Sequence, residues 1–209
     1  MRGLILAVPN KGRLRGPTME LLERANIRPL DDDRIYLSNT TLEGVQLLSI
    51  RAADIPIYVY YGIADLGITG KDVVAESGLE VYELADMGFG DCNLVVAVKS
   101  DSKYRDPSVL PQGTKVATEF PNLTKQFFND LGIQVEIITL RGAVEIAPIL
   151  GLADCVVDLS STGRTLERNG LRAIGTILRS TAKLICNKVA YKTRHEQIKM
   201  LENLLVRNK

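Results

Sequence analysis

The side chains best suited to chemistry in this chain lie in residues 154–166, Asp-Cys-Val-Val-Asp-Leu-Ser-Ser-Thr-Gly-Arg-Thr-Leu. Asp158 stands where an apolar run ends, and Gly163 lacks the Cβ that would keep an anion away from the backbone. Four hydroxyl side chains fall within six positions: Ser160, Ser161, Thr162 and Thr165. A helix beginning near this point would add unpaired N–H groups and the positive end of its dipole. The pattern predicts a turn that holds a phosphate, with Asp158 accepting hydrogen bonds from ribose hydroxyls.

The same segment also fits a strand, a serine-rich loop and a helix cap, because Ser, Thr and Asp favour such junctions for capping alone. It has one glycine and no Gly-Lys-Ser/Thr sequence, so it matches neither a Walker loop nor a GxGxxG fingerprint. Nucleotide binding through those two cradles is therefore disfavoured. A phosphorylated ribose suits the hydroxyls and the carboxylate better.

A second candidate anion site is the turn after the predicted strand Leu4 to Val8. Lys11 and Arg13 flank Gly12 there, just ahead of a helical pattern, so cations and backbone N–H groups point at one place. Arg34 follows three aspartates and Arg51 ends a predicted strand, where a surface ion pair or a solvated strand end explains them equally well.

Carboxylates and glycines near these turns are further candidates. Glu145 could contact ribose hydroxyls or magnesium, or could favour a helix N-terminus through the dipole. In the run from Asp65 to Asp72, the glycines, Gly70 among them, indicate close backbone approach, while Asp72 could equally cap a helix.

Composition excludes several classes of function. The chain has 209 residues, 45% of them hydrophobic, and its 26 Lys and Arg nearly balance 25 Asp and Glu, so no overall field favours nucleic acid or an anionic membrane. No apolar stretch approaches a membrane span and the amino terminus does not resemble a signal peptide; we expect a cytoplasmic protein. Its three cysteines are expected to be reduced core residues, and a single histidine, His195, leaves no His/Cys zinc cluster and no Ser-His or Cys-His couple.

The chain contains a faint internal repeat. Gly62-Ile-Ala-Asp65 resembles Gly151-Leu-Ala-Asp154, and each follows a segment with an arginine and then a proline. Each half reads strand, turn, helix, strand, helix, strand, which predicts two similar α/β lobes with mainly parallel sheets and flanking helices. We expect lobe 1 to comprise residues 1–94 plus 185–209 and lobe 2 residues 95–184, with predicted strands Leu94 to Lys99 and Lys183 to Ala190 as a hinge beside a ligand cleft.

Four motifs in one order resemble the catalytic chain of ATP phosphoribosyltransferase. They are Asn10-Lys-Gly-Arg-Leu14, Arg51-Ala-Ala-Asp-Ile-Pro56, Gly62-Ile-Ala-Asp-Leu-Gly-Ile-Thr-Gly-Lys-Asp72 and Asp154-Cys-Val-Val-Asp-Leu-Ser-Ser-Thr-Gly-Arg-Thr-Leu166. The resemblance covers nearly the whole chain. It implies a fold similar to the type II periplasmic binding proteins. It also implies the first reaction of histidine biosynthesis, in which N1 of ATP joins C1 of phosphoribosyl pyrophosphate (PRPP) and pyrophosphate leaves, with Mg²⁺ present.

The resemblance also implies roles for individual residues. The hydroxyl-rich turn holds the 5-phosphate of PRPP, with Asp158 near the ribose, and we add Glu145 to this PRPP set. The turn residues are Ser161, Thr162, Gly163, Arg164 and Thr165, of which Arg164 departs from the small or polar residue common in that slot. The pyrophosphate and triphosphate side takes Lys11, Gly12, Arg13, Arg34, Arg51, Asp65 and Gly70.

The chemistry needs no protein nucleophile, because adenine N1 attacks directly. The transition state has oxocarbenium character and the leaving pyrophosphate gathers charge, so positioning and electrostatics supply the rate. We therefore expect Lys11 and Arg13, with the metal, to be the catalytic cations.

The length resembles the short form of this family, which depends on a separate regulatory subunit related to histidyl-tRNA synthetase in a hetero-octamer. Two other classes stay open at this point. A type I phosphoribosyltransferase usually places two adjacent acidic residues where Val157 and Asp158 stand here. A non-catalytic solute-binding protein would share the lobes but is usually exported.

Overall fold

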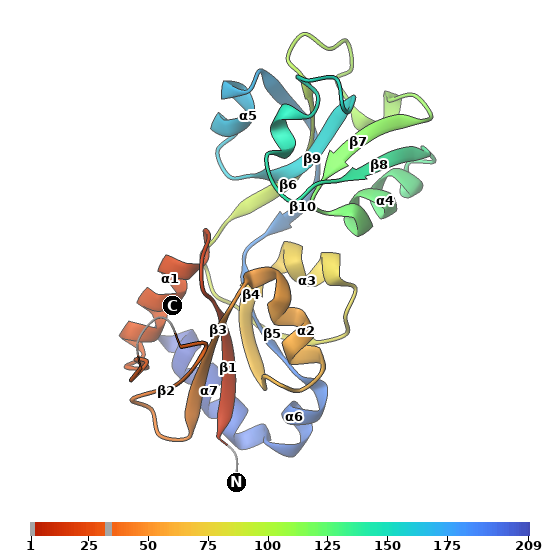
Figure 1. Ribbon diagram of the computed structural model, residues 1–209. Coiled ribbons are helices and arrows are strands. Elements are labelled where there is room, and N and C mark those ends of the chain that lie inside the picture. Colours follow the sequence, from red (N-terminus) through yellow and green to blue (C-terminus); the bar gives the residue numbers. More distant parts are fainter. Residues whose placement is uncertain (1–2, 32–34) are drawn as a thin grey trace. The chain divides into compact units, whose positions relative to one another are not determined.

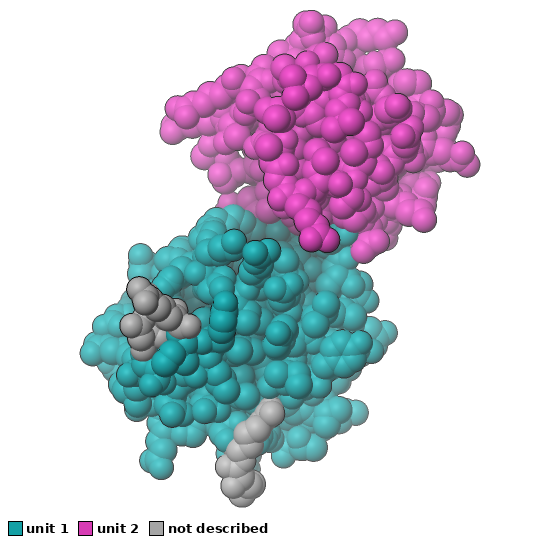
Figure 2. Space-filling model, viewed as in Figure 1, with its two compact units in different colours: residues 1–90, 181–209 teal, residues 91–180 magenta. Residues whose placement is uncertain are grey.

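The computed structural model describes residues 3–31 and 35–209. The chain divides into two compact units, residues 1–90 with 181–209 (unit 1) and residues 91–180 (unit 2), coloured separately in Figure 2. Both boundaries come a few residues before the expected ones at 94/95 and 184/185. The reason is that the strands at the two crossings each pair inside one sheet along almost their whole length.

Unit 1 is built on a six-stranded sheet in the order β2-β3-β1-β4-β11-β5 (Figure 1). Its strands are β1 (Leu4–Pro9), β2 (Leu37–Asn39), β3 (Val45–Ile50), β4 (Leu66–Gly70), β5 (Tyr82–Asp86) and β11 (Ala182–Cys186). Its helices are α1 (Arg15–Arg24), α2 (Ile55–Tyr60), α3 (Lys71–Ser77), α6 (Lys188–Thr193) and α7 (His195–Arg207). Strand β1 pairs in parallel with β3 and β4, whereas β2 and β11 pair antiparallel with their neighbours.

Strand β1 shows how the sequence makes the layers of unit 1. Leu4, Leu6 and Val8 belong to one buried cluster with the apolar side chains of α1 and α7, whereas Ile5 and Ala7 belong to another with those of α2 and α3. Because successive side chains of a strand point to opposite faces, an unbroken apolar run fits a strand covered by helices on both sides.

Unit 2 is built on a five-stranded sheet in the order β10-β6-β9-β7-β8. Its strands are β6 (Cys92–Lys99), β7 (Thr114–Thr118), β8 (Val135–Thr139), β9 (Cys155–Ser160) and β10 (Leu171–Ser180). Its helices are α4 (Pro121–Asp130) and α5 (Arg164–Arg168), with short 3-10 turns at Pro107–Val109 and Val144–Ile146. Here β7 pairs in parallel with β8 and β9, while β6 pairs antiparallel with β9 and β10. Both sheets are thus mixed, with a parallel core of three strands each.

The repeat seen in the sequence is present as matching backbone contacts. In unit 1 the Asp65 carboxylate accepts the Ile5 N–H at 2.8 Å, and the Asp65 N–H donates to the Ile5 carbonyl at 2.9 Å. In unit 2 the Asp154 carboxylate accepts the Lys115 N–H at 2.8 Å, and the Asp154 N–H donates to the Lys115 carbonyl at 2.8 Å. Each aspartate therefore ties its strand to the first parallel strand of the unit at the amino edge of the sheet.

One predicted element is wrong. The strand expected from Lys183 to Ala190 ends at Cys186, because the Asn187 side chain accepts the N–H groups of Val189 and Ala190 and so caps α6. The three cysteines are free and buried, as expected. In the part of the chain that the structure describes, no helix is long and apolar enough to span a membrane.

Candidate functional site

In unit 2, the hydroxyl-rich turn joins β9 directly to α5. Ser160 ends β9, its hydroxyl oxygen accepts the Gly163 N–H at 3.0 Å, and Gly163 takes a φ of +77° that favours glycine. The Ser160 hydroxyl thus closes the turn. The hydroxyls of Ser161, Thr162 and Thr165 are exposed and make no hydrogen bond with any described residue. These three hydroxyls, together with the first N–H groups of α5, are free to meet an anion.

Asp158 lies just before this turn, half-buried and two residues before the carboxyl end of β9. Burial raises the pKa of its carboxyl to about 6; the Leu159 N–H, donating at 2.7 Å, partly offsets this, and the charges of Glu145 and Glu119 add to the rise. The Glu145 side chain is half-buried on the 3-10 turn after β8, and Glu119 is exposed after β7. Unit 2 therefore brings two further carboxylates close to Asp158, just before the hydroxyl-rich turn.

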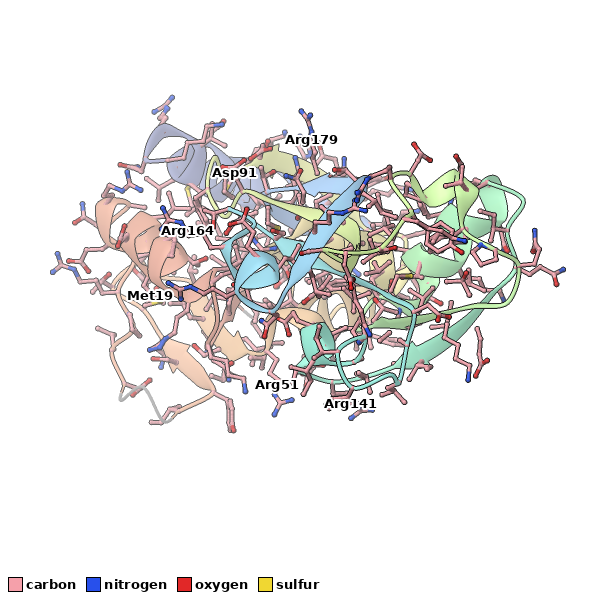
Figure 3. All side chains as sticks on the ribbon, turned by 90° about the horizontal axis from the view of Figure 1, so that it is seen from above. Met19, Arg51, Asp91, Arg141, Arg164 and Arg179 are labelled. Carbon is pink, nitrogen blue, oxygen red and sulfur yellow. The ribbon has the colours of Figure 1, made fainter. Side chains whose placement is uncertain are left out.

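In unit 1, the corresponding edge carries cations. Lys11 follows β1 and Arg51 follows β3, and the two strand ends are adjacent because Pro9 pairs with Ile50. Both side chains are exposed, with no hydrogen bond or ion pair to a described residue, and Arg51 extends away from the ribbon (Figure 3). Gly12, at a φ of +81° with open space around its Cβ position, forms the bend between Lys11 and Arg13. This edge is suited to an anionic ligand with several charges.

Arg13 belongs to the same turn, but it is held by the protein. Its Nη2 lies 2.8 Å from the Asp72 carboxylate and its Nη1 donates to the Gly90 carbonyl. The Arg13 side chain is 33% exposed and that of Asp72 is 2% exposed. The guanidinium therefore has a fixed end in the protein and an end that solvent reaches.

Comparison with known proteins places these features in a family. The family model of ATP phosphoribosyltransferase, HisG, matches residues 51–207. The chain belongs to the ATP phosphoribosyltransferase family. A relative with that name from Halothermothrix orenii is 43% identical over 210 residues, covering 97% of this chain and 93% of the relative. Another from Methanopyrus kandleri is 49% identical over 187 residues but is spanned to only 65% of its length.

Solved structures agree with this assignment. The ATP phosphoribosyl transferase (HisG:HisZ) complex from Thermotoga maritima contains a chain that matches with a TM-score of 0.86 and 31% identity, covering 98% of both chains. The alkanesulfonate-binding protein SsuA from Xanthomonas axonopodis matches with a TM-score of 0.61 at 13% identity, over all of this chain and 73% of that chain. The second likeness confirms the expected fold class, similar to the periplasmic binding proteins, and says nothing of activity.

Two site residues predicted for the ATP phosphoribosyltransferase reaction have other places in the structure. Asp65 lies at the amino end of β4, 4% exposed, and its carboxylate holds the Ile5 N–H and Arg194. It is therefore an anchor at the edge opposite to Lys11 and Arg51. Gly70 lies at the correct edge but is buried. A Cβ there would come 2.2 Å from Asp72 Oδ1 and 3.1 Å from Arg13 Nη2, so Gly70 leaves room for that pair.

Other predicted residues have a described position, except one. Arg164 is the exposed first residue of α5, beside the turn hydroxyls. Arg34 lies outside the described residues.

Two residues near the site were not recognised from the sequence. Asp72 looked like a possible helix cap, yet it is the second residue of α3 and the ion-pair partner of Arg13. The sequence patterns give Glu119 no role. The repeat could have identified it, because the turn after β7 occupies the place that Lys11 and Arg13 take after β1.

Proposed function

We propose that this chain catalyses the family's reaction, the transfer of phosphoribose from PRPP to N1 of ATP with release of pyrophosphate, as the first step of histidine biosynthesis. The observation that carries the proposal is the turn after β9. It presents three exposed hydroxyls next to a half-buried carboxylate, in a chain that belongs to this family. A phosphate and a ribose require this combination of hydroxyl donors and a carboxylate acceptor.

Unit 2 is assigned to PRPP. Ser161, Thr162 and Thr165 donate hydroxyls to the 5-phosphate, Gly163 lets it approach the backbone, and Arg164 adds a cation at the start of α5. Asp158 accepts hydrogen bonds from the ribose hydroxyls. Glu145 adds a second carboxylate acceptor from the neighbouring 3-10 turn. Support for this comes from the contacts within unit 2, in which Ser160 closes the turn and the other hydroxyls stay exposed.

Unit 1 is assigned to the pyrophosphate group and the triphosphate of ATP. Lys11 supplies an exposed positive charge, Gly12 allows a close approach of the backbone, and Arg51 adds a second charge from the adjacent strand. Arg13 supplies a guanidinium whose direction is fixed by Asp72 and Gly90. Lys11 and Arg13 are the catalytic cations in this proposal, because charge grows on the leaving pyrophosphate as the bond to C1 breaks.

The proposed mechanism uses no covalent intermediate with the protein. Adenine N1 is the nucleophile, so the chain has to hold N1 in line with C1 and balance the charge that leaves. The exposed cations of unit 1 perform the second task. The carboxylates near the ribose suit a transition state in which positive charge develops on the sugar ring.

The carboxylates of unit 2 suit a magnesium ion that takes its other ligands from the substrate phosphates. Among the described residues no three His, Cys, Asp or Glu side chains form a complete metal cage. Mg²⁺ is commonly held by one or two carboxylates plus substrate phosphates, and Asp158 with Glu145 meets that need. The bound metal would neutralise phosphate charge.

A regulatory partner is also part of the proposal. The Thermotoga maritima chain was solved in a complex named HisG:HisZ, and its match covers 98% of this chain. We infer that this chain also assembles with a regulatory subunit related to histidyl-tRNA synthetase, in a hetero-octamer. Light scattering of the chain purified alone and co-expressed with such a subunit tests this. The cytoplasmic location stays a prediction.

The decisive experiment measures pyrophosphate release from ATP, PRPP and Mg²⁺, with and without the partner. We expect release that depends on both substrates and a product carrying phosphoribose on N1 of the adenine. Release with hypoxanthine or orotate in place of ATP would indicate a different transferase. Binding of PRPP without any release, in the presence of the partner, would contradict the proposal.

A further inference from the structure

We propose that Asp72 is a positioning residue for this reaction, which orients the Arg13 guanidinium at the carboxyl edge of the parallel strands of unit 1. Gly70 and Gly90 make the space in which the pair sits. This inference rests on the proposed role of Arg13 in binding pyrophosphate.

The contact between the two side chains is built from distant parts of unit 1. Arg13 lies in the turn before α1, and Asp72 lies in the first turn of α3, which follows β4 directly. Their side chains meet at 2.8 Å between Nη2 and Oδ1, and Nη1 donates to the Gly90 carbonyl. Two fixed acceptors at different nitrogens define the plane of a guanidinium, which a single contact would leave free to rotate.

The exposures of the two side chains distinguish positioning from plain stabilisation. Asp72 is 2% exposed, so its carboxylate cannot itself reach a ligand, whereas Arg13 is 33% exposed. A guanidinium has five N–H donors, and among the described residues Arg13 uses them on Asp72 and Gly90. The remaining donors are available to an anion. The nearby carboxylate weakens the net attraction for that anion but fixes the direction of the donors before the reaction begins, which is the condition for efficient charge stabilisation.

The two glycines show that the space around this pair is reserved. A Cβ on Gly70 would come 2.2 Å from Asp72 Oδ1, and a Cβ on Gly90 would come 3.1 Å from Arg13 Nη1 and 2.4 Å from Leu14 Cδ2. Either side chain would push the guanidinium or its acceptor away. The pair therefore depends on two backbone positions without side chains.

The first experiment is a double-mutant cycle of Asp72→Asn and Arg13→Gln, assayed with the partner present. Asn keeps the shape and one acceptor but loses the charge. We expect Asp72→Asn to lower kcat about tenfold, with little change in KM for PRPP, and to weaken binding of pyrophosphate with Mg²⁺, measured by calorimetry, by a similar factor. In the Arg13→Gln background, Asp72→Asn should cause no further loss, because its effect passes through Arg13. An equal loss in both backgrounds would overturn the inference, as would an unaltered Arg13→Gln enzyme.

The second experiment leaves both charged residues in place. Gly90 and Gly88 have the same φ of +74°, but only Gly90 has neighbours within 4 Å of a Cβ. Ala at either position costs the same backbone strain, so Gly88→Ala is the matched control for Gly90→Ala. We expect Gly90→Ala to lower kcat and pyrophosphate affinity at least fivefold, and Gly88→Ala to leave both within twofold. Equal effects would overturn the inference.

The two readouts separate this inference from the proposed function. If the wild-type complex releases no pyrophosphate from ATP and PRPP, the proposed function fails, yet calorimetry still compares pyrophosphate binding by the variants. If turnover is normal and Asp72→Asn changes neither kcat nor pyrophosphate affinity, the positioning role alone fails. Thermal unfolding midpoints confirm that each variant is folded.

Discussion

The two units share one frame but differ in which strand carries the long turn. In unit 1, residues 10–14 separate β1 from α1, whereas α3 begins at Lys71 directly after β4 ends at Gly70. In unit 2, only residues 119–120 separate β7 from α4, whereas residues 161–163 separate β9 from α5. The longer turn therefore follows the first parallel strand in unit 1 and the third parallel strand in unit 2.

What stays the same between the units is structural. The aspartate anchors Asp65 and Asp154 make the same pair of backbone contacts. Helices α1 and α4 also end alike: Asn26 and Gly132 both have positive φ, and the next N–H reaches back to the carbonyl five residues earlier. The frame is therefore kept by groups away from the carboxyl edge, and the turns at that edge are free to differ.

What differs is the chemistry that each long turn brings. The turn of unit 1 carries Lys11 and Arg13, beside Arg51, while the turn of unit 2 carries exposed hydroxyls beside Asp158. On the proposed function, one unit meets the charged leaving group and the other meets the sugar phosphate. The comparison suggests substitutions that change one unit and leave the other intact.

The largest effect is expected in the turn of unit 2. Replacing Thr162 and Thr165 together by Val removes two hydroxyl donors while keeping the shape. Hydrogen bonds to a charged group contribute about 1.5–3 kcal/mol each, so KM for PRPP should rise by about a hundredfold or more. The measurement is the initial rate of pyrophosphate release as a function of PRPP concentration.

The matched control is Thr176→Val, an exposed threonine on β10 in the same unit. It should leave KM for PRPP within twofold and stability unchanged. An unaltered PRPP dependence in the double variant would remove the phosphate turn from unit 2.

The second prediction compares the two anchors. Asp65 is buried and also pairs with Arg194 at 3.2 Å, whereas Asp154 is exposed. Asp65→Ala should destabilise the protein by about 3 kcal/mol, because it removes the carboxylate that pairs with Arg194 and leaves the buried Ile5 N–H without its acceptor, and Asp154→Ala by about 1 kcal/mol. Urea unfolding measures both. Equal losses would show that burial does not distinguish the two anchors.

The anchors also show what could be predicted from the sequence. The Gly-x-Ala-Asp echo was visible, and it correctly indicated two α/β units with a common order of elements. Its role was not visible, because Asp65 forms its contacts with Ile5 and Arg194, 60 and 129 positions away. The family resemblance therefore places Asp65 on the ATP and pyrophosphate side, and local patterns contain nothing that corrects it. The hydroxyl-rich turn was easier to recognise because its residues are neighbours in the sequence.

The Arg13–Asp72 pair illustrates the same limit. Each residue was noticed in its own segment, but 59 positions separate them, and only the pairing of β1 with β4 brings their segments together. In the sequence, Gly70 indicates close backbone approach without identifying the group that approaches, and no pattern points to Gly90. Contacts across the sheet are decided by tertiary structure, which local patterns do not contain.

A third, smaller effect concerns two carboxylates with opposite shifts. Burial raises the pKa of Asp158 in unit 2 to about 6. Asp86 in unit 1 is also partly buried, but hydrogen bonds from Lys183, Thr181 and the Gly88 N–H outweigh that effect and lower its pKa to about 2.

The sign of the pH dependence follows from these directions. Between pH 3.8 and about 6 the folded chain holds a proton on Asp158 that the unfolded chain has lost, so stability falls as pH rises through this window and levels off above it. The loss of stability is about 1–2 kcal/mol. This is less than the full shift in the Asp158 pKa would give, because the carboxylate is only half-buried. Asp158→Asn should remove this slope. Asp86→Asn should lower stability evenly from pH 4 to 7, because Asp86 stays charged there. Urea unfolding across this pH range checks both, and a slope that persists in Asp158→Asn would contradict the assignment.

The smallest effect distinguishes two arginines at equivalent places. Arg51 follows β3 in unit 1, and Arg141 follows β8 in unit 2 two positions after its last residue; both extend from their own ribbon (Figure 3). Arg51 adds to the charge of Lys11, whereas Arg141 belongs to a unit whose edge carries Asp158, Glu145 and Glu119, which offset a cation.

Arg51→Gln should therefore weaken the binding of pyrophosphate with Mg²⁺ about fivefold at low salt, and Arg141→Gln less than twofold. The Arg51 effect should shrink as salt is raised to about 0.5 M, since both cations are exposed and exposed charges are screened. Calorimetry at two salt concentrations measures this. If the two variants lose affinity equally, the division of phosphate chemistry between the units is wrong in this respect.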